Sequence, residues 1–143
     1  MSGYSLLAEP IAEAALAAAR LARARGASIS ADLSSWSSIR DYGPEAFRAN
    51  LEALAPDVIF ANEPEWEKVG GANAHAETAL VKRGSRGVEV RSAAGIAEYE
   101  PLDAEVVDST GAGDALAAGF LVGGIELGLE AAARCVGQMG AVP

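Results

Sequence analysis

A short glycine-rich stretch, Gly111-Ala112-Gly113-Asp114, opens a long apolar run and has residue types that suit anion chemistry. Gly111 and Gly113 lack a Cβ, so the backbone there can turn sharply and approach a ligand closely. Free N–H groups in the first turn of a helix, together with the helix dipole, favour an anion such as a phosphate. Asp114 then stands beside that anion, where a carboxylate does not help to bind phosphate. A base that deprotonates an attacking hydroxyl group explains its presence.

Two further stretches, Asn62 to Glu65 and Gly84 to Gly87, follow predicted strands. In an open α/β fold the carboxyl ends of the strands face one crevice, so these stretches and the glycine loop are expected there. Asn62 and Glu65 can organise Mg²⁺ through its water shell, because Mg²⁺ bound to nucleotide phosphates needs few direct protein ligands. The combination supplies the positioning, the charge stabilisation and the base that phosphoryl transfer needs.

Each of these residues also has an ordinary structural explanation. Asparagine, aspartate, serine and threonine cap helices, acids are favoured in a first helical turn, and glycines are typical of hairpins. Capping or turn formation alone is the alternative explanation for Asn62, Glu63, Glu65, Gly84, Gly87, Asp108, Ser109 and Thr110.

Strand and helix patterns alternate along the chain, which predicts an α/β sheet of mostly parallel strands with one antiparallel hairpin and flanking helices. Strands are predicted at 27–33, 57–61, 78–82, 88–91, 96–99 and 105–107. Helices are predicted at 10–25, from 44 to before Pro56, at 63–69, from the glycine loop to about 121, and at 129–139. Residues 36–42 are predicted to be irregular, and 73–77 to form a polar segment.

The composition is that of a folded domain, with 143 residues, 50% hydrophobic and 22% charged. A formal net charge of −9 argues against a nucleic-acid or anionic-membrane partner, because either calls for clustered lysine and arginine. The single cysteine, Cys135, excludes an intrachain disulfide and fits a reducing compartment. No signal peptide is visible, and the uncharged apolar run at 115–125 is too short to span a bilayer. A cytoplasmic protein is therefore predicted.

The stretch Asp108-Ser109-Thr110-Gly111-Ala112-Gly113-Asp114, followed by Ala118-Gly119-Phe120, resembles the C-terminal signature of the PfkB/ribokinase-like carbohydrate kinases. Asn62-x-x-Glu65 resembles the second hallmark of that family, and Val81-Lys82-x-Gly84-x-x-Gly87 is similar to its nucleotide-proximal strand and turn. The order and spacing of the three motifs agree, from about Ser2 to the end of the chain. The resemblance implies that residues 1–143 form the C-terminal, ATP-side half of a ribokinase-like doubly wound sheet.

The resemblance also implies roles for individual residues. Asp114 is the implied base that deprotonates a sugar hydroxyl for attack on the γ-phosphate of ATP, and the amides of Gly111, Ala112 and Gly113 are the implied anion hole. ATP and phosphate binding is implied for Asn62, Glu65, Lys82, Gly84, Gly87 and Thr110. Mg²⁺ is implied as the cofactor, held by Asn62 and Glu65 through water, and the implied ligands are ATP and a small sugar.

The chain departs from the family pattern in one respect. Members of the family are longer, and their N-terminal half, which carries the sugar-binding acid and glycines and a small β lid, has no counterpart here. We therefore expect an exposed sheet edge that favours self-association, and little or no kinase activity from this chain alone. Three hypotheses follow: part of a working sugar kinase, an inactive remnant that only binds nucleotide, or a partner-binding subunit completed by another chain. The intact catalytic residues favour the first.

Overall fold

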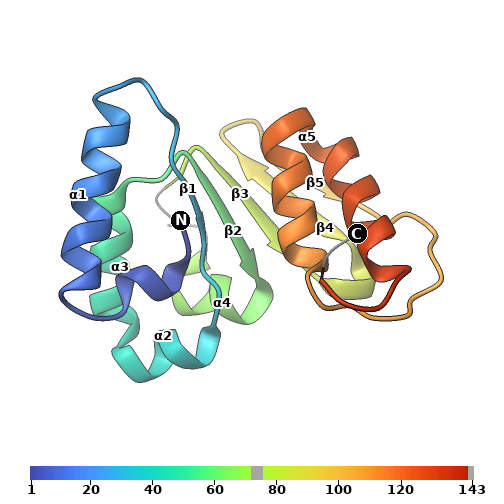
Figure 1. Cartoon of the computed structure of the whole chain (residues 1–143), viewed down its shortest axis with the longest axis horizontal. Coiled ribbons are helices and arrows are strands. Elements are labelled where there is room, and N and C mark those ends of the chain that lie inside the picture. Colours follow the sequence, from blue (N-terminus) through green and yellow to red (C-terminus); the bar gives the residue numbers. More distant parts are fainter. Residues whose placement is uncertain (72–75, 142–143) are drawn as a thin grey trace. The chain divides into compact units, whose positions relative to one another are not determined.

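The computed structural model describes residues 1–71 and 76–141, and the chain divides into two compact units. The first unit consists of Met1–Arg83 and Val88–Glu98, and the second of Gly84–Gly87 and Tyr99–Pro143. Figure 1 shows the order of the elements along the chain. The predicted α/β class is confirmed, because helices alternate with strands and five strands form one mixed sheet in the order β1-β2-β3-β4-β5.

The sheet brings three strand ends to a common edge. The strands are β1 (Ser30–Asp32), β2 (Val58–Asn62), β3 (Thr78–Lys82), β4 (Val88–Ser92) and β5 (Gly95–Tyr99). β1 pairs with β2 and β2 with β3 in parallel, whereas β4 is antiparallel to β3, as the hairpin prediction required. Because β1, β2 and β3 run in the same direction, their last residues, Asp32, Asn62 and Lys82, lie at the same edge of the sheet.

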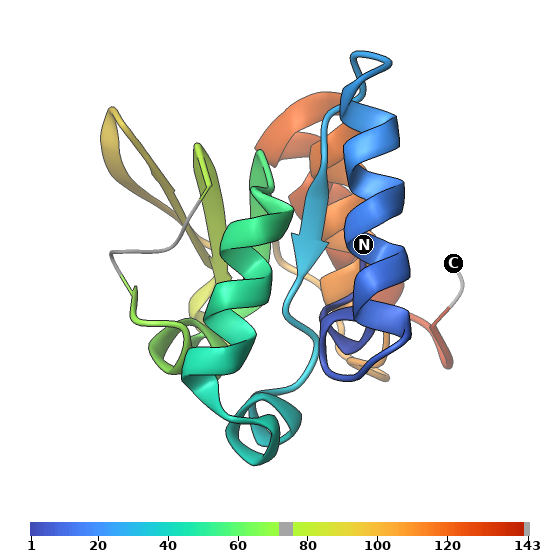
Figure 2. The same cartoon turned by 90° about the vertical axis from the view of Figure 1, so that its left-hand side faces the viewer.

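Helices of the first unit pack on this sheet around an apolar core. They are η1 (Gly3–Leu6), α1 (Ile11–Arg23), α2 (Trp36–Tyr42), α3 (Pro44–Leu54) and α4 (Glu63–Lys68). Figures 1 and 2 show α1 and α3 side by side along the strands. The core joins Ala15 and Ala19 of α1 to Phe47 and Leu51 of α3 and to Ile59 of β2. Alanines at the buried positions of α1 let this helix approach its neighbours closely.

The prediction that residues 36–42 are irregular is wrong, because they form α2. The side chain of Ser35 accepts a hydrogen bond from the backbone N–H of Ser38 at 3.3 Å, which caps the helix. Ile39 in its middle is fully buried. A single cap and a single buried residue in seven positions left too weak a periodic pattern for sequence-based recognition.

The second unit contains η3 (Gly84–Arg86) and a long apolar helix, α5 (Ala112–Val136). α5 is broken at Gly123 (φ −147°, ψ 18°) and Gly124 (φ 83°, ψ −169°), which have non-helical backbone angles. The two helices predicted for this region are therefore present, but the second begins at Ile125 instead of position 129.

The two segments of α5 fold back on each other through glycines. A Cβ on Gly119 would lie 2.5 Å from the carbonyl oxygen of Leu127, and one on Gly128 would lie 2.9 Å from that of Leu116. Real Cβ atoms do not approach backbone so closely, so both positions depend on the absence of a side chain. The Gly119–Gly128 contact thus allows the hairpin of helices to form.

Among the described residues, α5 is the one helix long and apolar enough to cross a membrane by length and composition. Core helices of soluble proteins pass the same test. The break at Gly123 and Gly124 divides it into segments that are each shorter than the ~20 residues a span requires.

The strand predicted at 105–107 is absent. The backbone N–H groups of Val107 and Asp108 instead both donate to the carbonyl oxygen of Val136, at 2.8 and 3.2 Å, so the end of α5 holds this segment. The strand predicted at 27–33 is shorter, being β1 alone. Most of the polar segment predicted at 73–77 lies outside the described residues.

Candidate functional site

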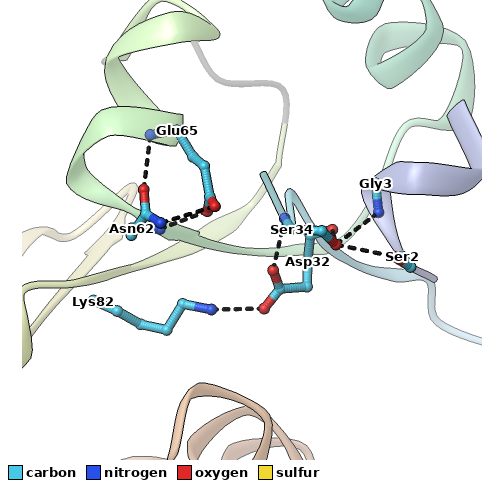
Figure 3. Close-up of polar contacts among 7 residues, drawn as sticks. All are labelled: Ser2, Gly3, Asp32, Ser34, Asn62, Glu65 and Lys82. Atoms are coloured by element: carbon cyan, nitrogen blue, oxygen red, sulfur yellow. Dashed lines mark hydrogen bonds and ion pairs between the residues drawn. The ribbon is translucent and has the colours of Figure 1, made fainter. Parts of the chain in front are cut away.

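Asn62 and Glu65 form a reciprocal pair where β2 passes into α4 (Figure 3). The Glu65 N–H donates to Oδ1 of Asn62 at 2.9 Å, while the backbone N–H and Nδ2 of Asn62 donate to the two carboxylate oxygens of Glu65, each at 2.8 Å. This is a capping box, in which each side chain satisfies a backbone N–H of the other residue. Both residues therefore do cap α4, and both Glu65 oxygens are already hydrogen-bonded.

The Glu65 carboxyl group is almost completely buried, with 3% of the residue exposed. Burial raises its pKa above the ordinary value of 4.5, because the charged form loses hydration. The hydrogen bonds from Asn62 and the positive charge of Lys82 oppose this rise, and the negative charge of Asp32 adds to it. These electrostatic effects place Glu65, Lys82 and Asp32 in one interacting group.

Lys82 reaches across the sheet edge to an acid that the sequence analysis missed. Its Nζ lies 2.7 Å from Oδ2 of Asp32, and both side chains are about one-fifth exposed (20% and 23%). Oδ1 of Asp32 accepts a hydrogen bond from the backbone N–H of Ser34 at 2.9 Å. The signal that could have identified Asp32 is its place near the end of a predicted strand, the same criterion that selected Asn62.

In the second unit, Asp108 organises the loop that precedes α5. Its Oδ1 accepts from the Thr110 N–H at 2.9 Å and its Oδ2 from the Gly140 N–H at 3.1 Å. The hydrogen bonds from Thr110 lower the pKa of Asp108 below its ordinary value, and that from Gly140 adds to the effect. Cys135, a buried free thiol, contributes a contact from Sγ to the Thr110 carbonyl oxygen at 3.4 Å. The loop is thus fastened to the last turn of α5 and to Gly140, which follows it.

The glycine loop opens α5 as predicted, with Gly111 at the N-cap in a left-handed conformation (φ 81°). A Cβ on Gly111 would lie 2.8 Å from the Cα of Ala141, so this glycine is required for its φ and for its close packing. The Ala112 N–H donates to Ser109 at 3.3 Å in a turn. In the part of the chain that the structure describes, the N–H groups of Gly113 and Asp114 have no backbone or side-chain acceptor.

Asp114 is exposed and lines a hollow of about 460 Å³ in the second unit. Its walls are mostly small apolar residues, and Arg134 is the other charged residue in it: the hollow is lined by Asp114, Ala115, Ala118, Gly119, Ala131, Arg134 and Ala141. A volume of this size is typical of small-molecule sites. Arg134 was not predicted, because it lies on the second segment of α5, far from the signature in sequence.

Gly84 and Gly87 shape the turn between β3 and β4, with φ values of 60° and 79°. The Gly87 N–H donates to the Gly84 carbonyl oxygen at 3.0 Å. A Cβ on Gly87 would lie 1.9 Å from the carbonyl oxygen of Tyr99, which no side chain could tolerate. Both glycines therefore take part in this turn.

The predicted site residues thus fall in two groups. Asn62, Glu65 and Lys82 meet with Asp32 in the first unit, and the residues from Thr110 to Asp114, like Gly84 and Gly87, belong to the second. Among the described residues, no group of three or more histidine, cysteine or acidic side chains is arranged to hold a metal ion.

These features define an α/β protein with polar residues gathered at the ends of parallel strands, and comparison with known proteins gives its family. The model of the family described as "pfkB family carbohydrate kinase" matches residues 1–142, so the chain belongs to that family. The resemblance seen in the sequence is confirmed.

Several relatives and solved structures are similar over 86% or more of this chain. An ATP-dependent ribose-1-phosphate kinase from Halopiger xanaduensis is 38% identical over 137 residues, which cover 86% of this chain and 43% of that protein. A probable sugar kinase from Rhizobium etli superposes with a TM-score of 0.86 at 28% identity, covering 99% of this chain and 49% of that one. The adenosine kinase of Sinorhizobium meliloti gives 0.84 at 28% identity, with coverages of 99% and 49%.

A third structure is that of the aminoimidazole riboside kinase from Salmonella enterica, complexed with aminoimidazole riboside and an ATP analogue. It superposes with a TM-score of 0.82 at 25% identity, covering 99% of this chain and 56% of that one. The chain thus spans about half the length of the relatives that it matches.

Proposed function

We propose that this chain supplies the ATP-binding part and the catalytic base of a kinase that phosphorylates a hydroxyl group of a sugar or nucleoside. In the proposed reaction Asp114 accepts the proton of the hydroxyl group, and the oxygen forms a bond to the γ-phosphorus of ATP. The bond between this phosphorus and the β,γ-bridging oxygen breaks. The products are a phosphate ester and ADP.

The geometry of the glycine loop is the observation that carries the proposal. Among the described residues, no acceptor is found for the N–H groups that Gly113 and Asp114 present at the start of α5, and the Asp114 carboxylate lines a hollow of about 460 Å³. N–H groups at a helix start stabilise negative charge that develops on a transferring phosphoryl group. The proposed anion hole consists of the N–H groups of Gly111, Ala112 and Gly113. The Ala112 N–H also donates to the Ser109 carbonyl oxygen at 3.3 Å, so it would have to donate to this oxygen and to the anion at once.

The remaining proposed roles concern the nucleotide. In the first unit, the Lys82 ammonium group contacts the phosphate chain, since two of its three N–H donors remain beyond the one that Asp32 accepts. In the second unit, Gly84 and Gly87 shape the nucleotide side, and Thr110 positions the loop through its contacts with Asp108 and Cys135. The acidic chain, with its buried free thiol, is proposed to act in the cytoplasm.

Mg²⁺ fits the Asn62–Glu65 pair as an ion held through water. Direct coordination would displace one of the 2.8 Å hydrogen bonds that fix the capping box, whereas a water molecule can donate to a remaining lone pair of Glu65. Mg²⁺ bound with the nucleotide would neutralise phosphate charge. Asn62 and Glu65 themselves orient the start of α4.

The relatives suggest the class of acceptor. Ribose 1-phosphate, adenosine and aminoimidazole riboside, which appear in the names of three matched kinases, all contain a ribose ring. We therefore propose a ribose-containing acceptor. The small residues around Asp114 leave room for a ring at this position.

The proposal is tested by comparing nucleotide binding and phosphoryl transfer in the same protein. Binding of Mg²⁺ with a non-hydrolysable ATP analogue is measured by calorimetry, and ADP release is measured with ATP and ribose 1-phosphate, adenosine or ribose. In an active longer form that contains this chain, Asp114→Asn is expected to change the dissociation constant by less than about twofold and to lower transfer by roughly 10²–10⁴-fold. Asp103→Asn, an exposed acid of the same unit, serves as the matched control with unchanged transfer.

The outcomes separate the hypotheses. Absence of nucleotide binding, or transfer that survives Asp114→Asn, contradicts the proposal. Nucleotide binding without transfer is the expected result for this chain alone, which spans about half the length of its relatives. Absence of transfer by an unmodified longer form that contains this chain supports the nucleotide-only alternative and contradicts a catalytic role for Asp114.

A further inference from the structure

Asp32 occupies a position from which it can direct a lysine across a neighbouring strand. It ends β1, Lys82 ends β3, and β2 lies between these two strands. The 2.7 Å contact between Lys82 Nζ and Asp32 Oδ2 therefore draws the lysine side chain over the end of β2 (Figure 3). Asn62, the last residue of β2, opens the capping box with Glu65 at this point.

Asp32 is itself fixed by the turn that follows it. The Ser34 N–H donates to Oδ1 of Asp32 at 2.9 Å, and the Ser34 hydroxyl group donates to the backbone carbonyl oxygen of Asp32 at 3.0 Å. Ser34 has a positive φ of 70°, a conformation that costs energy for a residue with a Cβ. Contacts of its Oγ with the Gly3 N–H (3.2 Å) and the Ser2 hydroxyl group (2.9 Å) support the turn.

A fixed carboxylate partner is especially useful for a lysine, because it restricts a flexible side chain. Its ammonium group stands on a flexible four-carbon stem, so placing it at one point costs side-chain entropy unless a fixed acceptor holds it. When the lysine side chain is already ordered before the ligand binds, less entropy is lost on binding and the affinity for the ligand is higher. Asp32 accepts from one of the three N–H groups and leaves the others for a second anion.

We propose that Asp32 is a positioning residue, which holds the Lys82 ammonium group over the end of β2 so that it meets the phosphate chain of the nucleotide. The inference rests on the proposed function, because it requires Lys82 to contact that chain. A merely structural ion pair would affect stability alone.

A double-mutant cycle tests the inference. Dissociation constants for Mg²⁺ with the ATP analogue are measured for the unmodified chain, Asp32→Asn, Lys82→Met and the double variant. Each single substitution is expected to weaken binding roughly tenfold, and the double variant no more than Lys82→Met, because Asp32 acts through Lys82. Asp32→Glu is expected to restore part of the affinity. Asp41→Asn, which removes an exposed ion pair with Arg40, is the matched control.

Amine labelling gives a second readout that does not depend on nucleotide. Lys68 and Lys82 are the lysines of the sequence, so Lys68 serves as an internal reference for acetylation followed by mass spectrometry. Asp32→Asn is expected to raise the labelling rate of Lys82 about threefold or more relative to Lys68, because the amine is then no longer held in its 2.7 Å ion pair and is more accessible to the reagent. The ATP analogue is expected to protect Lys82 in the unmodified chain.

The outcomes distinguish the inference from the proposed function. Additive losses in the double variant, or an unchanged labelling rate at Lys82 in Asp32→Asn, overturn the positioning role while leaving nucleotide binding intact. A chain that binds no nucleotide overturns both. Non-additive losses with faster labelling of Lys82 support both.

Discussion

The Lys82 ammonium group and the Asp32 carboxylate are paired at 2.7 Å although their strands are not adjacent, because the lysine spans the intervening strand β2. Both side chains are about four-fifths buried, which reduces the screening that makes exposed ion pairs weak. The strand ends of the first unit are therefore linked by side chains in addition to the backbone ladder.

This pair is expected to contribute measurably to stability. A urea-unfolding cycle of Asp32→Asn and Lys82→Met should give a coupling free energy of about 1 kcal/mol, since the pair is only partly exposed. The pair Arg40–Asp41 on α2, whose side chains are 51% and 67% exposed, should give a coupling near zero. Equal coupling for the two pairs would show that burial does not strengthen the Asp32–Lys82 contact.

Gly111→Ala is expected to lower the free energy of unfolding by more than the cost of a positive φ for alanine. A Cβ at this position meets Ala141 at 2.8 Å in addition to requiring a positive φ. Gly140→Ala is the control, because Gly140 has a φ of 91° with open space around its Cβ position. We expect a loss of about 1–2 kcal/mol in the free energy of unfolding for Gly140→Ala and roughly twice that for Gly111→Ala. Similar losses would show that packing against Ala141 does not matter.

Gly119→Ala is expected to separate the two segments of α5. The new Cβ would lie 2.5 Å from the Leu127 carbonyl oxygen, so the cost of about 1–3 kcal/mol from overpacking exceeds the roughly 1 kcal/mol gained in helix propensity. Hydrogen exchange of α5 is the suitable readout, because both tryptophans, Trp36 and Trp66, lie in the first unit. Gly137→Ala, whose nearest neighbour is 3.6 Å away, should leave exchange unchanged. Unaltered protection in Gly119→Ala would contradict the packing argument.

Stability should depend on the protonation of Glu65. Burial raises its pKa in the folded state, so the folded chain binds this proton more tightly than the unfolded chain. The contribution is fully present below the ordinary value of 4.5 and is lost as the pH rises through the higher folded value. Unfolding free energies of the unmodified chain and Glu65→Gln, measured from pH 4 to 8, should therefore diverge as the pH rises, with the unmodified chain becoming relatively less stable. Parallel pH profiles would show that the carboxyl group is not desolvated.

The sequence predicted the elements whose patterns are strongest. β3 matches its predicted bounds, and the helix that begins at Pro44 was recognised from its proline and from the spacing of Phe47, Leu51 and Leu54. α2 was missed because its start depends on one hydrogen bond from the Ser38 N–H to Ser35. The strand expected at 105–107 is absent because its β-like residues contact the end of α5, a partner that local sequence does not reveal.

The candidate site was predicted in a similar way. Motif spacing identified Asn62, Glu65 and the residues from Gly111 to Asp114, since each follows a recognisable strand or opens a helix. Asp32 and Arg134 were missed because they belong to no local motif. Their relevance arises from strand order in one case and from the return of α5 in the other.

The anchoring of the glycine loop limits how its sequence can be reused. Val107 and Asp108 bond to Val136, Asp108 also bonds to Gly140, and Gly111 packs on Ala141. Transferring only the signature sequence to another protein would therefore omit the residues that hold the loop in its conformation. These contacts run from residue 107 to residue 141, so a transplanted loop needs that whole segment to keep them.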